Sequence, residues 1–346
     1  MNKFLFAVVL LTISQFASAQ GNGQDNYQIL QMVSPARVGA LGGNAMAIKD
    51  GDLNLGLLAP SLLDSTTSEQ IVLGYTRFFG EANIAHAGYA HHVKSLGTLS
   101  FSIQSLGYGD FEMTDPTGQV QGSFSAGEYV FQVGIGRVLN KNFSIGANVK
   151  YIMSELAEYK SSAIATDIST TFHKPERGFV ATLMMKNIGS SISSYRPGVS
   201  EQMPFEIQAG ISKKLEKAPL RFGLIAENLQ TWDLTTEQGS ETTEIDPITG
   251  EEVSNVNDGF GENLMRHLVL NAEIIVTKNI HLRMGYNYNR RQQLKIESRP
   301  GGGGFTYGLG VRIAKIHISY ARAAYSLAGA SNHFTLGVKF DDFKKS

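Results

Sequence analysis

The sequence FTYGLGVRIAKIHISY, residues 305–320, has the most regular pattern in the chain. Every second side chain on each side of Ala314-Lys315 is apolar: Phe305, Tyr307, Leu309, Val311, Ile313, then Ile316, Ile318 and Tyr320. Successive side chains of a strand point to opposite faces. A period of two therefore predicts two antiparallel strands, each with one apolar and one polar face, joined by a two-residue turn.

The same period recurs from Ile71 to Phe340 and predicts about fourteen strands. An even number of long antiparallel strands is typical of bacterial single-chain transmembrane barrels. The predicted strands are Ile71–Phe79, Ile84–Val93, Thr98–Gly107, Gly127–Leu139, Phe143–Met153, Ser161–His173, Phe179–Asn187, Pro204–Leu215, Leu220–Glu227, Leu264–Val276, Ile280–Asn289, Phe305–Ile313, Ile316–Ala324 and Asn332–Phe340.

The connections between these strands alternate between short turns, often with Lys, and longer polar segments. Transmembrane barrels have short periplasmic turns and longer extracellular loops in this order. We therefore expect an all-β, 14-stranded antiparallel transmembrane barrel over residues 71–340, a periplasmic tail at 341–346 and both termini in the periplasm. The longer segments are Tyr108–Ala126, Ser154–Lys160, Ile188–Met203, Asn228–Asn263, Arg290–Gly303 and Tyr325–Ser331.

Composition bears on the alternative of a soluble β-sandwich or a secreted barrel, which would turn its apolar faces inward. Lys3, the apolar run Phe4–Ile13 and Ala17-Ser18-Ala19 predict a signal peptide over residues 1–19. Export, the alternation of loop lengths and the polar second face favour a Gram-negative outer membrane with its lipid and lipopolysaccharide. The chain has no Cys and a net charge of −1, which suggests neither disulfides nor a nucleic-acid partner.

The segment SPARVGALGGNAMAIKDGDLNLGLLAPSLL, Ser34–Leu63, lacks this alternation and is rich in Ala and Gly. Pro35 suits the start of a short helix, which Gly42-Gly43 would end. We expect residues 20–70, here called the plug, to fill the barrel lumen with one or two small helices, its first residues up to Gln31 being loosely held. The candidate plug residues are Arg37, Leu41, Gly42, Gly43, Asp50, Asp52 and Pro60.

Charged residues on the polar strand faces would point into the lumen. We expect them to pair with one another, or with Arg37, Lys49 and Asp50 of the plug, and so to close the pore. These residues are Glu128, Lys150, Asp167, Glu206, Arg221, Glu273, Arg283 and Arg312.

Candidate sites for chemistry are few, and no metal, cofactor or catalytic residue is predicted. His86 and His92 would share a strand face while His91 points away, so the three do not converge on a metal. Asp50-Gly51-Asp52 resembles the start of a calcium loop, but the loop's sixth position is Leu55 rather than Gly. A tight turn is the better interpretation. The motifs G-x-S-x-G and H-E-x-x-H are absent.

The longest outer segment, 228–263, carries many carboxylates and no Lys or Arg. An acidic loop outside the cell could dock a basic partner surface or calcium-bridged lipopolysaccharide. The candidate docking residues are Glu244, Asp246, Glu251, Glu252 and Asp258.

Three stretches carry a family resemblance: Ser34–Leu63, Gly74–His92 and Phe101–Arg137. They resemble the FadL-like outer-membrane barrels, which have fourteen strands and an N-terminal plug, and within these the PorV/PorQ family of the type IX secretion system. Where FadL-like barrels usually have Asn before the plug proline, this chain has Ala59.

The resemblance implies a non-enzymatic component that docks cell-surface proteins of the attachment complex (PorZ-like, PorV-like and PorU-like). The alternative is a FadL-like transporter of a hydrophobic small molecule, with an apolar lateral pocket near the plug. A barrel hydrolase would need a His with an acid or Ser at the outer rim, and no such set stands out.

Overall fold

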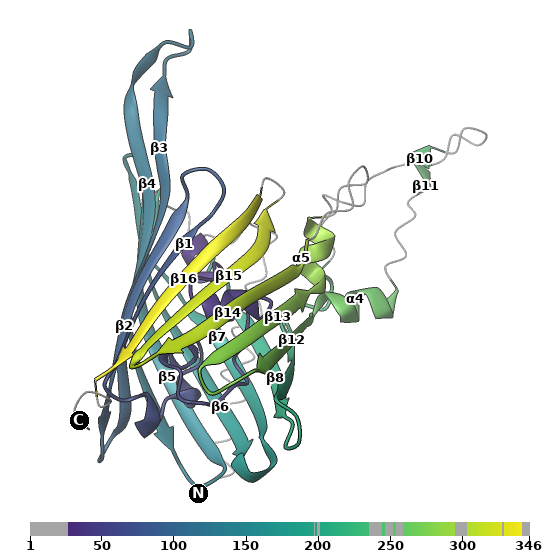
Figure 1. Ribbon diagram of the computed structural model, residues 1–346. Coiled ribbons are helices and arrows are strands. Elements are labelled where there is room, and N and C mark those ends of the chain that lie inside the picture. Colours follow the sequence, from purple (N-terminus) through teal and green to yellow (C-terminus); the bar gives the residue numbers. More distant parts are fainter. Residues whose placement is uncertain are drawn as a thin grey trace, which may run out of the picture.

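The computed structural model describes residues 27–196, 198, 201–234, 244–245, 252–253, 259–294, 303–326 and 329–340. Within them, fourteen strands form one closed antiparallel barrel (Figure 1). Each strand pairs with the next along the chain, and β1 also pairs with β16, which closes the cylinder. The predicted 14-stranded barrel is therefore confirmed.

The strands alternate in direction around the barrel, with short turns at one end and longer connections at the other. The barrel strands are β1 (Gln70–Arg77), β2 (Asn83–Val93), β3 (Gly97–Thr114), β4 (Val120–Val138), β5 (Phe143–Leu156), β6 (Tyr159–Lys174), β7 (Phe179–Ser193), β8 (Glu206–Lys214), β9 (Leu220–Ala226), β12 (Leu268–Ile275), β13 (Ile280–Asn287), β14 (Phe305–Ile313), β15 (Ile316–Ser326) and β16 (Gly329–Lys339).

The two faces of the barrel wall differ as the sequence pattern predicts. In β14 and β15, Tyr307 and Ile318 point outward and are 55% and 44% exposed, while Thr306 and Ser319 point inward and are 3% and 7% exposed. Apolar rows on the outside and polar rows inside fit a cylinder surrounded by lipid. A soluble barrel would have the opposite arrangement.

The hairpin of β3 and β4 extends far beyond the barrel rim (Figure 1). The sequence interpretation placed a polar loop at Tyr108–Ala126, but both strands run on and meet at a turn around Gly118. Beyond the rim, both faces of a strand meet water, so polarity along the segment was not evidence against strand structure. The loop predicted at Ser154–Lys160 is likewise shortened, since β5 and β6 reach Leu156 and Tyr159.

Two short helices stand at the long-loop end: α4 (Phe260–Arg266) and α5 (Tyr288–Gln293). Each replaces the end of a predicted strand, so β12 begins at Leu268 rather than Leu264. A further short helix, η4 (Pro175–Arg177), forms the β6–β7 turn, and β10 (Glu244–Ile245) pairs with β11 (Glu252–Val253) in a separate ribbon. None of the helices in the described ranges is long and apolar enough to cross a membrane.

The described part of the plug, residues 27–69, lies inside the barrel, where Figure 1 shows it in purple. The predicted loose start is wrong for its described residues, because Tyr27 and Ile29 are 1% and 2% exposed. Residues 1–26, with the predicted signal peptide, and the tail 341–346 lie outside the described residues. The plug's helices are η1 (Gln28–Leu30), α2 (Ala36–Ala40), α3 (Leu53–Leu58), η2 (Pro60–Leu62) and η3 (Ser65–Thr67).

The end of β16 lies beside the start of β1 at the short-turn end, with Lys339 opposite Gln70. The assignment of this end to the periplasm stays a prediction.

Candidate functional site

One arginine of the plug joins the plug to the barrel wall. The Arg37 guanidinium binds Asp50 at 2.7 Å, Asp52 at 3.0 Å and Glu273 of β12 at 3.0 Å. Burial alone would lower the pKa of Arg37, but the three carboxylates outweigh burial and raise it above its usual value. Both carboxylates of the Asp50-Gly51-Asp52 turn thus bind an arginine. This fits a tight turn that fixes the plug rather than a calcium loop.

Two wall arginines complete this cluster. Arg221 of β9 binds Asp50 at 2.8 Å and Glu273 at 2.6 Å, and Arg283 of β13 binds Glu273 at 2.8 Å. Burial favours the neutral form of Asp50, yet the charges of Arg37 and Arg221 outweigh it and hold its pKa well below the usual range. The predicted pairing of lumen charges with plug charges is present here.

A separate ion pair within the plug joins Lys49 to Asp64 at 3.1 Å. Neutral contacts bind the plug elsewhere: the backbone N–H of Ala36 donates to Thr335 at 2.9 Å, and the hydroxyls of Ser61 and Thr171 lie 2.7 Å apart. Because these contacts reach β6 and β16 as well as β12, the plug is held from several sides of the cylinder.

The remaining candidate plug residues either pack in the apolar interior or set where the plug helices begin and end. Leu41 is completely buried among apolar side chains of the plug and wall. Gly42 and Gly43 have positive φ of 85° and 95° and end α2, as predicted. The N–H of Gly42 donates to Thr306 at 2.9 Å, and Pro60 begins η2.

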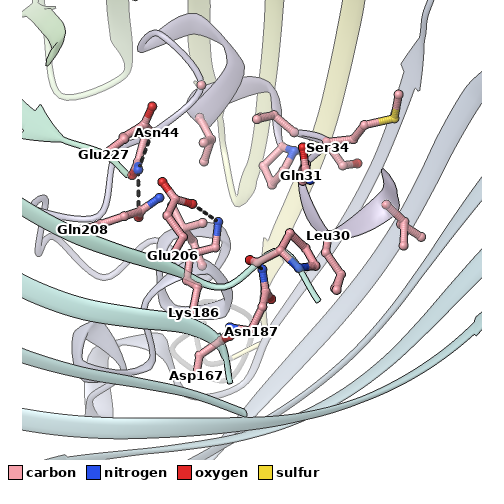
Figure 2. Close-up of a pocket in the computed structure, with 18 of the residues that line it drawn as sticks. Leu30, Gln31, Ser34, Asn44, Asp167, Lys186, Asn187, Glu206, Gln208 and Glu227 are labelled. Atoms are coloured by element: carbon pink, nitrogen blue, oxygen red, sulfur yellow. Dashed lines mark hydrogen bonds and ion pairs between the residues drawn. The ribbon is translucent and has the colours of Figure 1, made fainter. Parts of the chain in front are cut away.

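A cavity of about 340 Å³ lies between the plug and the barrel wall (Figure 2). It is bounded on one side by the plug and on the other by lumen faces of the wall. The plug contributes mainly apolar side chains, namely Leu30, Met32, Val33, Val38, Leu57 and Leu58. The wall contributes amides and charges, namely Gln104, Gln132, Lys150, Asp167, Lys186, Asn187, Glu206, Gln208, Glu227, Asn287 and Arg290.

Most charges on this wall have a partner. Lys150 binds Asp167 at 2.6 Å and donates to Asn187 at 2.9 Å, while Lys186 lies 3.5 Å from Glu206. Asn187 sits at a β-bulge with φ of 56° and donates its N–H to Asp167. The bulge turns the Asn187 side chain into the lysine–aspartate pair, and so fixes this corner of the cavity.

Among solved structures, a Pseudomonas aeruginosa FadL homologue is similar to this chain with a TM-score of 0.50, 10% sequence identity, and coverage of 89% of this chain and 99% of that one. The chain has a FadL-like fold. The Pseudomonas putida toluene transporter TodX is also similar, with a TM-score of 0.49, 11% identity, and coverage of 90% and 98%. No protein-family model matches the sequence, and no curated protein matches it.

The FadL-like barrel also has an apolar hollow of about 440 Å³ on its lipid face, lined by residues of β5 to β9 and β12. Ala181, Ala209 and Ala226 line it among larger apolar residues. The hydrogen-bonded ladders β7–β8 and β8–β9 continue beneath it, so the wall is closed there. This hollow is separated from the plug by the wall, so the apolar lateral pocket near the plug that the transporter alternative predicts stays a prediction.

The three histidines considered as a metal site, His86, His91 and His92, each contact a different residue. His86 contacts Ser34 at 2.6 Å in the lumen, His91 contacts Glu69 at 2.5 Å, and His92 contacts Thr98 at 2.9 Å. Within the described ranges, no group of acidic and histidine side chains could hold a metal ion.

The acidic docking residues are only partly described. In the β10–β11 ribbon, Glu244 is paired with Val253 and Glu252 with Ile245. Asp246, Glu251 and Asp258 lie outside the described residues. Their role in docking stays a prediction.

The sequence interpretation missed the wall glycines against which the plug packs. A Cβ at Gly146 would overlap the Pro60 backbone, and one at Gly285 would overlap the backbone of Gly42. Both glycines occupy lumen-facing positions of predicted strands. Their place on the lumen face could have indicated this contact, because a glycine there lets another segment's backbone approach the strand closely.

Proposed function

We propose that this chain is a non-enzymatic outer-membrane transporter, in which a small solute binds between the plug and the wall and passes when the plug shifts. The cavity of about 340 Å³ is the observation that supports this most. Its size lies at the lower end of typical small-molecule sites. The FadL-like fold supports the same proposal.

The contacts of the plug suggest how passage would be controlled. The plug is bound to the wall by polar groups, such as Arg37 with Glu273 and Ser61 with Thr171, and by an apolar cluster that includes Leu41 of the plug and Val269 of β12. The solute would need an apolar part, because the plug side of the cavity is lined by Leu, Val and Met.

A disulfide that fixes the plug tests this proposal. The chain has no Cys, so Ser61→Cys with Thr171→Cys would form a unique link between plug and β6. We expect oxidised proteoliposomes to lose flux of small aromatic solutes such as toluene or benzyl alcohol, and dithiothreitol to restore it. Each single Cys variant serves as the control. Equal flux in oxidised and reduced vesicles would contradict a moving plug.

A second candidate is the docking role in a type IX attachment complex. The β3–β4 hairpin favours it, because Phe111, Met113 and Val120 are 43%, 49% and 58% exposed beyond the rim. Exposed apolar side chains there would suit a protein partner. Pull-down from detergent-solubilised outer membranes tests it: recovery of surface or secretion proteins supports docking, and their absence counts against it.

A further inference from the structure

Glu227 differs from the other carboxylates that line the cavity. It stands one residue beyond β9 and accepts hydrogen bonds from two amides, Asn44 at 2.8 Å and Asn287 at 3.4 Å. Within the described ranges, no side-chain nitrogen of Lys, Arg or His lies within ion-pair distance of its carboxylate, while His267 contacts its backbone oxygen at 2.7 Å. The neighbouring carboxylates of Asp167 and Glu206 both have a lysine partner.

The two amides fix the Glu227 carboxylate without neutralising it. Asn44 belongs to the plug and also donates to Gln208 at 2.9 Å, so its position is set by the wall (Figure 2). A carboxylate has about four acceptor positions, and the amides occupy two. The remaining ones are available to a donor in the cavity.

The charged groups around Glu227 are Glu206 of β8, Lys186 of β7 and Arg290 of α5. Burial and the Glu206 carboxylate raise the pKa of Glu227 to about 6, so the group is ionised at pH 8. A carboxylate held in a partly dry site gains most from a positively charged hydrogen-bond donor.

The plug side of the cavity carries the apolar side chains of Leu30, Val33 and Leu58 beside the polar Gln31 and Ser34. A ligand that satisfies both sides has an apolar body and a cationic end. We propose that the solute of this cavity is a small organic amine, whose ammonium group binds Glu227 while its apolar part lies against the plug. This rests on the transporter proposal for the same cavity.

Calorimetric titration of the full chain in detergent tests the assignment. The probes are 2-phenylethylamine and its neutral analogue 2-phenylethanol, both at pH 8. We expect the amine to bind about tenfold or more tightly than the alcohol, and Glu227→Gln to remove that difference. Glu227→Asp should retain part of it. Glu155→Gln, the same change at an exposed residue outside the cavity lining, should leave it unchanged.

The outcomes separate this inference from the transporter proposal. Equal binding of the two probes to the wild type, or no binding of either, would overturn the amine assignment. Flux through the disulfide-controlled plug would still decide the transporter proposal. An amine preference that persists in folded Glu227→Gln would also overturn the assignment. Folding of each variant is checked by the shift in gel mobility on heating.

Discussion

A single guanidinium, that of Arg37, connects two plug carboxylates to one on the wall. It is buried, with a side chain only 5% exposed, so water can replace little of what it provides. Removing one member of a buried ion cluster leaves the others without compensation, and this costs more than the cluster contributes when intact.

Arg37→Met is therefore expected to loosen the plug. Asp50, Asp52 and Glu273 would then share only Arg221 and Arg283. We expect a loss of about 3–5 kcal/mol in the free energy of unfolding of the plugged state, measured by urea titration in detergent, and new single-channel currents in planar bilayers. Lys160→Met, which removes an exposed ion pair with Glu155, should change neither. Unchanged currents in Arg37→Met would contradict the anchoring role.

Asp50 makes this stability depend on pH. Its pKa in the folded protein lies below the unfolded value of about 3.9, so its contribution is complete above that pH and is lost as the pH falls further. Asp50→Asn should be less stable than the wild type at pH 7, and the gap in melting temperature should narrow progressively below about pH 4. A gap that stays constant down to pH 2 would exclude Asp50 as the titrating group.

For single residues, the sequence predicts which kind of contact a side chain makes better than it predicts which residue the side chain contacts. Lumen-facing charges were expected to pair with one another or with Arg37, Lys49 and Asp50. Glu273 and Arg221 pair with Arg37 and Asp50, and Lys150 pairs with Asp167. Lys49 instead pairs with Asp64 inside the plug. The amides around Glu227 could not be predicted, because Asn44 and Asn287 are separated by most of the chain. Only the closed barrel brings them together.

The β3–β4 hairpin shows where the alternation of polar and apolar residues fails to predict a strand. Period two predicts a strand where one face is in lipid, but above the membrane both faces are in water. Phe111 and Phe124 stack there with ring centroids 5.4 Å apart, a cross-strand pair that supports the ribbon without lipid.

Shortening this hairpin should therefore leave the barrel intact. Replacing residues 111–124 by an Asn-Gly turn removes only segments beyond the rim. We expect the melting temperature and heat-dependent gel mobility to stay as in the wild type, while any partner bound through the hairpin is lost from pull-downs. A large drop in melting temperature would show that the barrel depends on the hairpin.

The wall strands also set how closely the plug can approach. At Gly146, Val would push against the backbone of Pro60 and Ser61, which cannot move aside as a side chain could. We expect Gly146→Val to cost about 1–3 kcal/mol in unfolding free energy and to increase conductance. Gly122→Val, on β4 beyond the plug, has open space around it and serves as the matched control. Equal conductance of the two variants would contradict close plug packing.

For the whole molecule, the sequence contains most of what is needed to infer the barrel. Fourteen alternating segments with short turns between every second pair are enough to infer a closed barrel. Within a bilayer, only a closed sheet gives every backbone N–H and C=O group of its strands a hydrogen-bond partner. The path of the plug could not be inferred. It depends on contacts such as Ser61 with Thr171 and Ala36 with Thr335, which no local pattern encodes.

The plug precedes β1 in the chain, yet α2 rests on the last strands to be made, with Ala36 bonded to Thr335 of β16. The seam between β1 and β16 therefore surrounds a segment that was translated before either strand. A cylinder already sealed would leave no route for residues 27–69 to enter from the side. Residues 27–69 therefore either enter through one end of the finished cylinder or are in place before β1 and β16 meet.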